Sequence, residues 1–580
     1  MCGITGIISK EKFSVKEELL KALKKLEYRG YDSSGFSTCN GHIIKALGEI
    51  KNLFSKTDPK LQTNCAIAHT RWATHGGVTI NNAHPHVSMN NKISLVHNGI
   101  IENYEELRND LIKKGYTFQS ETDTEVIANF LEANLDKGIH DAIKLFIKKA
   151  KGTYGLVIIV KNENKIYAAK QDSPLCLGIA KDKNIIASDA YAFSELSQDV
   201  IFFEDGEFAE ITPTGYEFYN LKGKVNKVIK EIKWDTKKVS KENYPHYMLK
   251  EIIEQPESVE RLLKSLKGPQ KNNLKKIADL VKKSKRILFL ACGTSYHAGL
   301  IGSYHLSKLG YEAHAVIASE FENFSVIDKN TLIIVISQSG ETMDVITVLK
   351  GIMKHNPTIV SIVNSPYSTL QRMSKVSIEI MAGQEICVGA TKTFTNTLIA
   401  LFQIAKELGR ETDLDKIPKM IEYTLENNKK NVYEISKRLK NKRDIFVLGN
   451  KISYPVAREV SLKLKEISYK HAQGMMAGEL KHGTIALIEK GVPVIGLIHD
   501  TNKTKIESAL EEVEARGAEI YKIGNGCKMF DLPSHMNEEE FSICSTIIGH
   551  LLSYHIARMN KLPIDKPRNL AKSVTVKWLT

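Results

Sequence analysis

Residues 1–7 read Met-Cys-Gly-Ile-Thr-Gly-Ile, a short apolar run typical of a β-strand, with a thiol at its start. The second residue is small, so removal of the initiator methionine would leave Cys2 with a free α-amino group. A thiol needs a base to become a good nucleophile, and an α-amine that titrates at about 7.7–8.0 is partly unprotonated at neutral pH. Cys2 could supply both nucleophile and base, or it could be a buried cysteine in a first strand. Position alone does not decide between these interpretations.

Length and composition predict a multidomain globular protein. The 580 residues are enough for three or four domains of about 150 residues each. Hydrophobic residues make up 42% and charged residues 26%, and the formal net charge is +14. Many lysines are scattered with Glu and Asn, as on solvated helix ends, so we expect no nucleic-acid binding. The positive excess could help attract anionic substrates.

The eight cysteines are dispersed, without CxxC spacing, and no signal peptide is recognisable. This usage predicts free thiols in a reducing, cytoplasmic compartment. Apolar runs such as residues 331–336 are too short to span a bilayer, so we expect no membrane association.

Residues 1–240 have an α+β pattern of many short strands. Strands are predicted at residues 65–69, 93–97, 155–160 and 208–211, and helices at about 16–26, 102–114 and 123–135. This pattern favours antiparallel strands with helices outside.

Polar residues follow several of these strands. Asn98 and Gly99 suit an oxyanion hole, because they offer a side-chain amide and an accessible N–H. Arg71 could hold the carboxylate of an amino-acid substrate and Asp123 its ammonium group. Each has a simpler alternative, since Asn-Gly is a common turn and Asp123 could cap a helix together with Thr122.

Histidines are frequent in the same region and raise the question of a metal site. The set is His69, His75, His84, His86 and His97. No Cys or acidic residue completes a recognisable ligand pattern, so we expect no metal.

Four motifs together resemble class II glutamine amidotransferases: residues 2–4, 70–76, 97–103 and 121–125. The resemblance implies an N-terminal-nucleophile hydrolase fold, in which two antiparallel sheets lie between helix layers. It implies Cys2 as nucleophile and Asn98 with Gly99 as oxyanion hole. It also implies a glutamine-binding set of Arg71, Trp72, Thr74, His75 and Asp123.

After a charge-rich stretch at residues 221–250, read as a linker, the pattern changes to strand, tight loop and helix. Apolar strands are predicted at 286–291, 332–336 and 358–363, and the pattern recurs about 158 residues later at 445–450, 492–498 and 518–523. Continuous apolar strands alternating with helices predict two tandem α/β domains with parallel sheets. Ligands then bind at the carboxyl ends of the strands.

The two copies differ in their loops. Residues 337–342, Ser-Gln-Ser-Gly-Glu-Thr, gather hydroxyls and helix N-terminal N–H groups into a phosphate cradle, next to Cys-Gly-Thr-Ser at 292–295. The second copy has His-Asp-Thr-Asn at 499–502 instead. We expect only the first copy to hold phosphate.

The second copy carries ionisable groups. Glu459, Lys463 and Glu466 lie at i, i+4 and i+7 on one helix face, a stripe that is most often solvated. Chemistry on a sugar phosphate could use ionisable groups of this copy and of the tail. Glu466 could act as a base between C1 and C2, His482 could open the ring, and Lys572 is a Schiff-base candidate.

These motifs and their order along nearly the whole chain resemble the glutamine–fructose-6-phosphate aminotransferase (isomerising) family. The resemblance implies sugar-phosphate binding by Thr294, Ser295, Ser337, Gln338, Ser339, Thr342 and Val388. It implies catalysis by Glu466, by His482 from the partner subunit of a homodimer, and by Lys572, with Glu459 and Lys463 in support. It implies glutamine and fructose 6-phosphate as substrates, no cofactor, and ammonia transfer between domains.

The predicted organisation is an amidotransferase domain at 2–220, a linker at 221–250, sugar-isomerase domains at 251–425 and 426–565, and an active-site tail at 566–580. Two alternatives stay open. One is a related sugar-phosphate amidotransferase or deaminase, and the other is a non-catalytic phosphosugar sensor.

Overall fold

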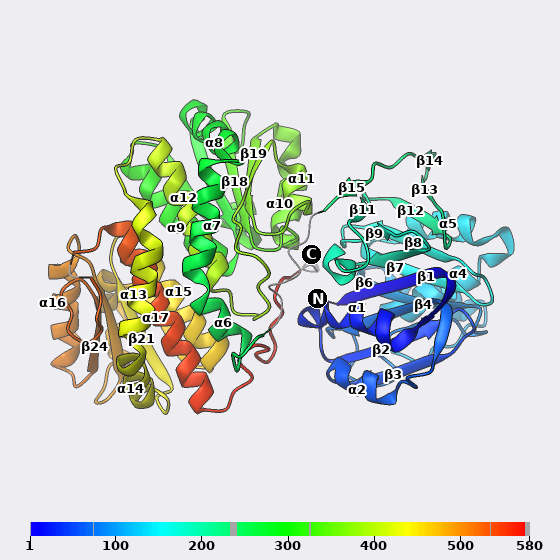
Figure 1. Cartoon of the computed structure of the whole chain (residues 1–580), viewed down its shortest axis with the longest axis horizontal. Helices are drawn as coiled ribbons and strands as arrows, with labels where there is room; N and C mark the ends of the chain where they lie inside the picture. Colours follow the sequence, from blue (N-terminus) through cyan, green and yellow to red (C-terminus); the bar gives the residue numbers. More distant parts are fainter. Residues whose placement is uncertain (1, 74, 233–240, 324–325, 534, 575–580) are drawn as a thin grey trace. The chain divides into compact units, whose positions relative to one another are not determined.

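The computed structural model describes residues 2–73, 75–232, 241–323, 326–533 and 535–574 (Figure 1). The chain divides into two compact units. The first contains the residues up to 237 together with those from 571 onward, and the second contains residues 238–570. Each unit is described separately below.

The first unit is built on two antiparallel sheets. One has the strand order β15 (Lys230–Glu231), β11 (Asp199–Phe202), β9 (Cys176–Ile179), β10 (Lys183–Ala187), β1 (Gly3–Ser14), β4 (Gln62–Arg71), β2 (Ser33–Thr38) and β3 (Ile43–Leu47). The other has the order β14 (Gly223–Val225), β13 (Tyr216–Asn220), β12 (Glu207–Ile211), β8 (Ile166–Gln171), β7 (Gly152–Val160), β6 (Ile93–Ile101) and β5 (His86–Val87). Strands β14 and β15 fall in the stretch read as a linker, where they pair with β13 and β11; residues 233–240 of that stretch lie outside the described residues.

Helices cover the outer faces of both sheets. Apolar side chains that alternate along the strands, such as Ile4 and Ile8 of β1 and Val157 of β7, form a core between the sheets. Helices α3 (Tyr104–Lys113), α4 (Asp123–Glu132) and α5 (Ile139–Lys149) pack on the seven-stranded sheet, and α1 (Leu20–Lys24) and α2 (Ile50–Lys56) pack on the other. The predicted pair of antiparallel sheets between helix layers is confirmed.

The second unit contains the two predicted parallel sheets. The first has the order β17 (Ala313–Ile317), β16 (Arg286–Ala291), β18 (Thr331–Ser337), β19 (Thr358–Val363) and β20 (Val376–Glu379). The second has the order β22 (His471–Met476), β21 (Asp444–Gly449), β23 (Pro493–Ile498) and β24 (Glu519–Gly524). The repeat inferred from the sequence is therefore a repeat of structure.

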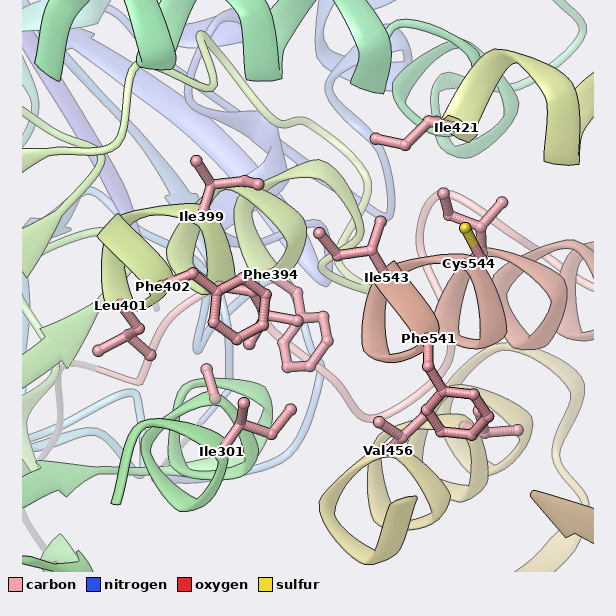
Figure 2. Packing of buried hydrophobic residues seen from close by; sticks show 14 of the residues in the cluster. Ile301, Phe394, Ile399, Leu401, Phe402, Ile421, Val456, Phe541, Ile543 and Cys544 are labelled. Atoms are coloured by element: carbon pink, nitrogen blue, oxygen red, sulfur yellow. The ribbon is translucent and has the colours of Figure 1, made fainter. Parts of the chain in front are cut away.

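Helices join the two sheets through one continuous core. They are α6 (Tyr247–Ile253), α7 (Gln255–Lys267), α8 (Lys271–Lys283), α9 (Gly293–Lys308), α10 (Met343–Ile352), α11 (Thr369–Met373), α12 (Lys392–Glu407), α13 (Ile417–Asn427), α14 (Lys429–Leu439), α15 (Ser453–Ser468), α16 (Lys503–Glu514) and α17 (Glu538–Met559). Figure 2 shows Ile301 of α9, Phe402 of α12, Val456 of α15 and Phe541 of α17 in this core. Since α9 and α15 occupy equivalent positions in the two copies and pack together, residues of the first copy meet residues of the second.

The loop after β23 is held to the loop after β21 by hydrogen bonds from Asn502. The Asn502 amide donates to Asn450 O over 3.0 Å and to Ser453 Oγ over 2.7 Å, and Asn502 Oδ1 accepts the His499 N–H over 2.8 Å. The corresponding loop of the first copy, after β18, has no such asparagine in its sequence.

No helix in the described ranges combines the length and the apolar character needed to cross a membrane.

Candidate active site

Cys2 immediately precedes β1, beside the end of β4. The Trp72 N–H donates to Cys2 Sγ over 3.2 Å, and Sγ lies 3.5 Å from Trp72 O. Burial raises the pKa of the Cys2 thiol, while the Trp72 N–H and the Arg71 charge lower it in part. The thiol is therefore held in place but needs a base to become a thiolate.

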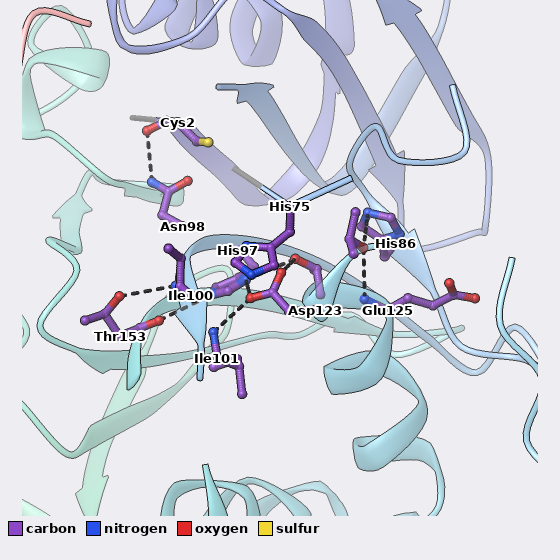
Figure 3. Close-up of polar contacts among 12 residues, drawn as sticks. Cys2, His75, His86, His97, Asn98, Ile100, Ile101, Asp123, Glu125 and Thr153 are labelled. Carbon is purple, nitrogen blue, oxygen red and sulfur yellow. Dashed lines mark hydrogen bonds and ion pairs between the residues drawn. The ribbon is translucent and has the colours of Figure 1, made fainter. Parts of the chain in front are cut away.

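The Asn98 side chain bonds to Cys2 (Figure 3) and is oriented by a buried histidine, His69. Asn98 Nδ2 donates to Cys2 O over 3.0 Å, and Asn98 Oδ1 lies 3.1 Å from His69 Nε2. His69 Nε2 also lies 3.0 Å from His97 O, so both of its neighbours are acceptors and this nitrogen carries the proton. Burial lowers the pKa of His69 to about 3, which keeps the ring neutral. The amide nitrogen of Asn98 is consequently held at the backbone of Cys2, as a donor for an oxyanion hole at this residue.

Gly99 occupies a position that excludes a side chain. Its φ is +131°, and a Cβ would lie 2.1 Å from Thr153 O of the neighbouring strand β7. The N–H offered next to Asn98 therefore depends on glycine.

Replacing Gly99 by Ala is expected to displace the β6 backbone, destabilise the protein by about 3 kcal/mol and lower glutamine hydrolysis by about 10²-fold or more. Thermal unfolding and glutaminase turnover measure the two effects. Gly115→Ala is the matched control, because Gly115 also has a positive φ, +87°, with nothing within 4 Å of an added Cβ. Equal losses in the two variants would contradict the steric explanation.

Arg71 holds a loop that borders the site. Its guanidinium donates to Gly77 O over 3.0 Å and to Gly76 O over 3.2 Å, and it also contacts His75 O. Burial lowers the pKa of Arg71, and the charges of Cys2 and Asp123 partly offset this effect. Arg71 is therefore close enough to both residues to interact with them electrostatically. Thr74, which precedes this loop, lies outside the described residues.

Asp123 is buried at the start of α4. Its carboxylate accepts the Ile101 N–H over 2.9 Å and lies 3.9 Å from His97 Nδ1 (Figure 3). Thr122 caps the helix by accepting the Glu125 N–H. The N-cap of α4 is therefore Thr122, and the Asp123 carboxylate bonds to the backbone of β6 instead.

Two aromatic contacts complete this part of the site. The Trp72 ring packs edge-on against Tyr31, with centroids 5.9 Å apart, and the His75 ring packs edge-on against Tyr104 at 5.5 Å. Both side chains are half-buried at the margin of the cysteine site.

In the second unit, the loop at 337–342 forms a compact turn of hydroxyl and N–H groups. Ser337 Oγ lies 2.8 Å from Thr342 Oγ1 and accepts the Gly340 N–H over 3.0 Å. Ser339 Oγ accepts the Glu341 N–H over 3.1 Å. The loop leads into α10, and β16 pairs with β18, so Thr294 and Ser295 at the start of α9 follow the neighbouring strand. These groups can bind phosphate without a lysine in the loop.

A buried ion network links the two copies. His297 Nδ1 lies 2.7 Å from Glu459 Oε2, and the Thr294 hydroxyl donates to Glu459 Oε1 over 3.0 Å. Glu459 is 0% exposed, so the Glu-Lys-Glu stripe is not a solvated face here. Burial alone would raise the pKa of Glu459, but Lys463 and the His297 contact lower it to about 2.

Lys463 connects this network to Glu466. Its Nζ lies 3.4 Å from Glu459 and 2.6 Å from Glu466 Oε2. Burial opposes the charge of Lys463, but the two carboxylates raise its pKa above the ordinary value. The loop that contains Val388 packs on the same helix, since a Cβ on Gly389 would lie 3.7 Å from Glu466 Oε2. Glu466 is thus a partly exposed carboxylate at the end of a buried charged chain.

The lowered pKa of Glu459 gives a pH-dependent stability. An unfolded Glu titrates near 4.5, so the stabilising contribution of this carboxylate is complete above that pH and disappears as pH falls toward about 2. We expect Glu459→Gln to cost about 3 kcal/mol at pH 7, because Lys463 loses a buried partner. In urea unfolding at pH 7, 5, 4 and 3, the difference in unfolding free energy between wild type and variant should become smaller as the pH falls. Glu434→Gln, at an exposed position, is the control. A difference in unfolding free energy that grows as the pH falls would contradict a lowered pKa for Glu459.

Two predicted residues are not brought to this network. His482 is exposed at the end of a 3₁₀ turn, Ala477–His482, and within the described ranges it makes no hydrogen bond or ion pair with Glu459, Lys463 or Glu466. Lys572 belongs to the residues that group with the first unit, so its role at the sugar stays a prediction.

The structure adds residues that the sequence analysis did not assign to the site. His297 lies three residues after Thr294 on α9, a spacing that could have indicated a shared helix face. Glu385 accepts the Thr391 N–H over 2.9 Å and so fixes the loop that carries Val388. His69 entered only as a possible metal ligand, and its contact with Asn98 has no local sequence signal.

Comparisons with known proteins agree with both units. The family model described as glutamine amidotransferase domain matches residues 69–195, and the one described as SIS domain matches residues 280–406 and 438–528. A glutamine–fructose-6-phosphate aminotransferase (isomerising) of Pyrococcus horikoshii is 40% identical over 99% of this chain and 100% of its own length. A protein of the same name from Thermococcus kodakarensis is 41% identical with the same coverage.

Solved structures resemble the second unit. The C-terminal domain of glucosamine-fructose-6-phosphate aminotransferase from Francisella tularensis is 35% identical, with a TM-score of 0.52, over 57% of this chain and all of that one. Tagatose-6-phosphate ketose/aldose isomerase from Escherichia coli shares the fold, with a TM-score of 0.51 at 15% identity over 58% of this chain and 98% of that one.

Fold and site together define a glutamine amidotransferase joined to a tandem sugar-isomerase unit. The full-length likeness makes the assignment specific. The chain belongs to the glutamine–fructose-6-phosphate aminotransferase (isomerising) family.

Proposed function

We propose that this protein converts fructose 6-phosphate and glutamine into glucosamine 6-phosphate and glutamate, the first step of hexosamine synthesis. The observation that carries the proposal is the presence, in one chain, of a cysteine whose backbone carbonyl is bonded to an oriented amide and of a hydroxyl-rich loop near an ionic network. The first is suited to releasing ammonia and the second to holding a sugar phosphate. Ammonia formed at the first site is passed to the sugar.

Glutamine hydrolysis starts at Cys2. Once Met1 is removed, the α-amine of Cys2 takes the thiol proton, and Sγ attacks the side-chain amide carbon of glutamine. Asn98 Nδ2 and the Gly99 N–H stabilise the oxyanion, ammonia leaves, and water hydrolyses the thioester. The substrate carboxylate replaces a loop carbonyl on Arg71, with Trp72, Thr74 and His75 nearby, and the substrate ammonium pairs with Asp123.

Sugar chemistry takes place in the second unit. Phosphate binds Ser337, Gln338, Ser339 and Thr342, with Ser295 beside them. His482 opens the ring, Lys572 activates the C2 carbonyl as a Schiff base, and ammonia displaces the lysine. Glu466 then moves a proton from C1 to C2, while Lys463 holds its carboxylate in position. The remaining members of the predicted set, Thr294 and Val388, shape the sugar pocket, Thr294 through its bond to Glu459.

The functional division at residues 2–220, 221–250, 251–425, 426–565 and 566–580 belongs to the same proposal. So does a cytoplasmic location, which the eight free thiols support.

The proposed protein is a homodimer in which His482 serves the sugar site of the partner. Its exposed position supports this arrangement. We expect Glu466→Gln and His482→Ala to be inactive separately, whereas an equimolar mixture after subunit exchange regains about a quarter of wild-type activity, because half of the dimers are mixed and each has one intact site. Native mass spectrometry of the mixture shows whether mixed dimers have formed, because the two variant chains differ in mass. No recovery despite exchange would place His482 in the site of its own chain.

The direct test is an assay of the purified protein for glutamate and glucosamine 6-phosphate, with intact mass measured for the N-terminus. We expect both products in equal amounts and a mass without Met1. A preference for another ketose phosphate would favour a related amidotransferase or deaminase, and binding without turnover would favour a phosphosugar sensor.

A further inference from the structure

Two cysteines that the proposed mechanism does not use lie opposite each other in the first unit. Strands β2 and β4 are antiparallel, with Thr38 opposite Ala66 at the end of the ladder, and Cys39 follows Thr38 next to Cys65. The Cys39 N–H donates to Cys65 O over 3.1 Å. Directly opposed residues have Cα atoms about 4.5–5.5 Å apart and side chains on one face, which falls within the Cα separation that a disulfide bridges.

The two thiols have different surroundings. Cys65 is 0% exposed in the core between the sheets. Cys39 lines a cavity of about 290 Å³ together with Ser37, Asn91 and Lys161. A small molecule that enters this cavity meets Cys39 first, in the presence of a lysine cation.

The two thiols belong to one buried cluster, and Cys39 Sγ lies 3.9 Å from the Thr63 hydroxyl oxygen. The neighbouring Cys65 and Thr63 side chains outweigh burial and lower the pKa of Cys39 to about 6. The Cys39 side chain and burial raise the pKa of Cys65 well above its ordinary value. At neutral pH the pair therefore consists of a thiolate facing a cavity and a thiol behind it, the arrangement of an attacking and a resolving cysteine.

We propose that Cys39 and Cys65 form an oxidative modification site, at which hydrogen peroxide that enters the cavity oxidises Cys39 and Cys65 converts the product into a disulfide. In the first step the Cys39 thiolate attacks one peroxide oxygen. The S–O bond forms, the O–O bond breaks, and the departing hydroxide takes a proton to become water, which leaves a sulfenic acid. Cys65 then attacks the Cys39 sulfur, the S–S bond forms, and the sulfenic oxygen leaves as water with the thiol proton. One peroxide is reduced to two waters while two thiols are oxidised.

The test uses the full chain with Cys2→Ala, which removes the competing half-buried thiol at the glutamine site. The protein is treated with hydrogen peroxide, blocked with N-ethylmaleimide, digested without reductant and analysed by mass spectrometry. We expect a linked pair of peptides containing Cys39 and Cys65, two hydrogens lighter than the separate thiols and released by dithiothreitol. With Cys65→Ser added, dimedone should trap the sulfenic acid on Cys39.

Cys544 provides the internal comparison, because it is also buried but burial raises its pKa to about 12. Cys39 should be oxidised at least about tenfold faster than Cys544 in the same sample. Equal rates at Cys39 and Cys544 would overturn the proposal. So would oxidation of Cys39 to the sulfinic acid while Cys65 remains a thiol.

Discussion

Cys2→Ala should abolish glutamine-dependent formation of glucosamine 6-phosphate, with a loss of about 10⁴- to 10⁶-fold in glutaminase turnover, as for removal of a nucleophile in other hydrolases. The expectation rests on Cys2, whose Sγ accepts the Trp72 N–H and whose backbone carbonyl accepts the Asn98 side-chain amide. Alanine keeps the backbone carbonyl that bonds to Asn98 and removes only the reacting sulfur atom. Glutamate release from glutamine measures the loss directly.

The same variant distinguishes the activity of the first unit from that of the second. Because the sugar site uses other residues, Cys2→Ala should still isomerise fructose 6-phosphate and should still make the amino sugar when ammonium replaces glutamine. Cys527→Ser is the matched control, since Cys527 is a half-buried thiol of the second unit that contacts Asn525 O. Glutamine-dependent synthesis by Cys2→Ala at the wild-type rate would exclude Cys2 as the nucleophile.

Glu466→Gln is expected to lower sugar isomerisation and amino-sugar formation by about 10²- to 10⁴-fold, the range for loss of a general base. The Glu466 carboxylate lies 2.6 Å from Lys463 Nζ and is the partly exposed end of the ionic network. Glutamine keeps the hydrogen-bonding shape but cannot accept the proton from C1.

The accompanying measurements distinguish chemistry from folding. Glutaminase turnover and the KM for fructose 6-phosphate should stay near wild type, because neither the cysteine site nor the phosphate loop is changed. Glu434→Gln, on the exposed face of α14, should leave all activities unchanged. A large rise in KM with unchanged kcat would assign Glu466 to binding and not to proton transfer.

Much of the fold follows from local patterns. The apolar runs at 286–291 and 358–363 coincide with β16 and β19, because a strand buried on both faces must be apolar throughout. Asn98, Gly99 and Asp123 could be assigned from their motifs. Asp123 lies at the start of α4, but Asn98 and Gly99 lie within β6, which continues beyond the predicted strand end at residue 97 and pairs with β7.

The environment of the ionic network could not be predicted in the same way. The spacing of Glu459, Lys463 and Glu466 is typical of a solvated helix face, yet Glu459 and Lys463 are 0% and 1% exposed. The contacts to Glu459 come from Thr294 and His297 of α9, more than 150 residues earlier in the chain. A pattern within one helix carries no information about such a distant partner. The role of His69 was hidden for the same reason, because its contact with Asn98 joins strands β4 and β6 of different sheets.

The asparagine that closes the loop after β23 has a consequence for stoichiometry. Asn502 bonds to Asn450 and Ser453, so this loop of the second copy is an internal turn, while its helix α15 supplies charged groups to the first copy. A chain with two equal pockets would saturate with two sugar phosphates. We expect this chain to saturate with one.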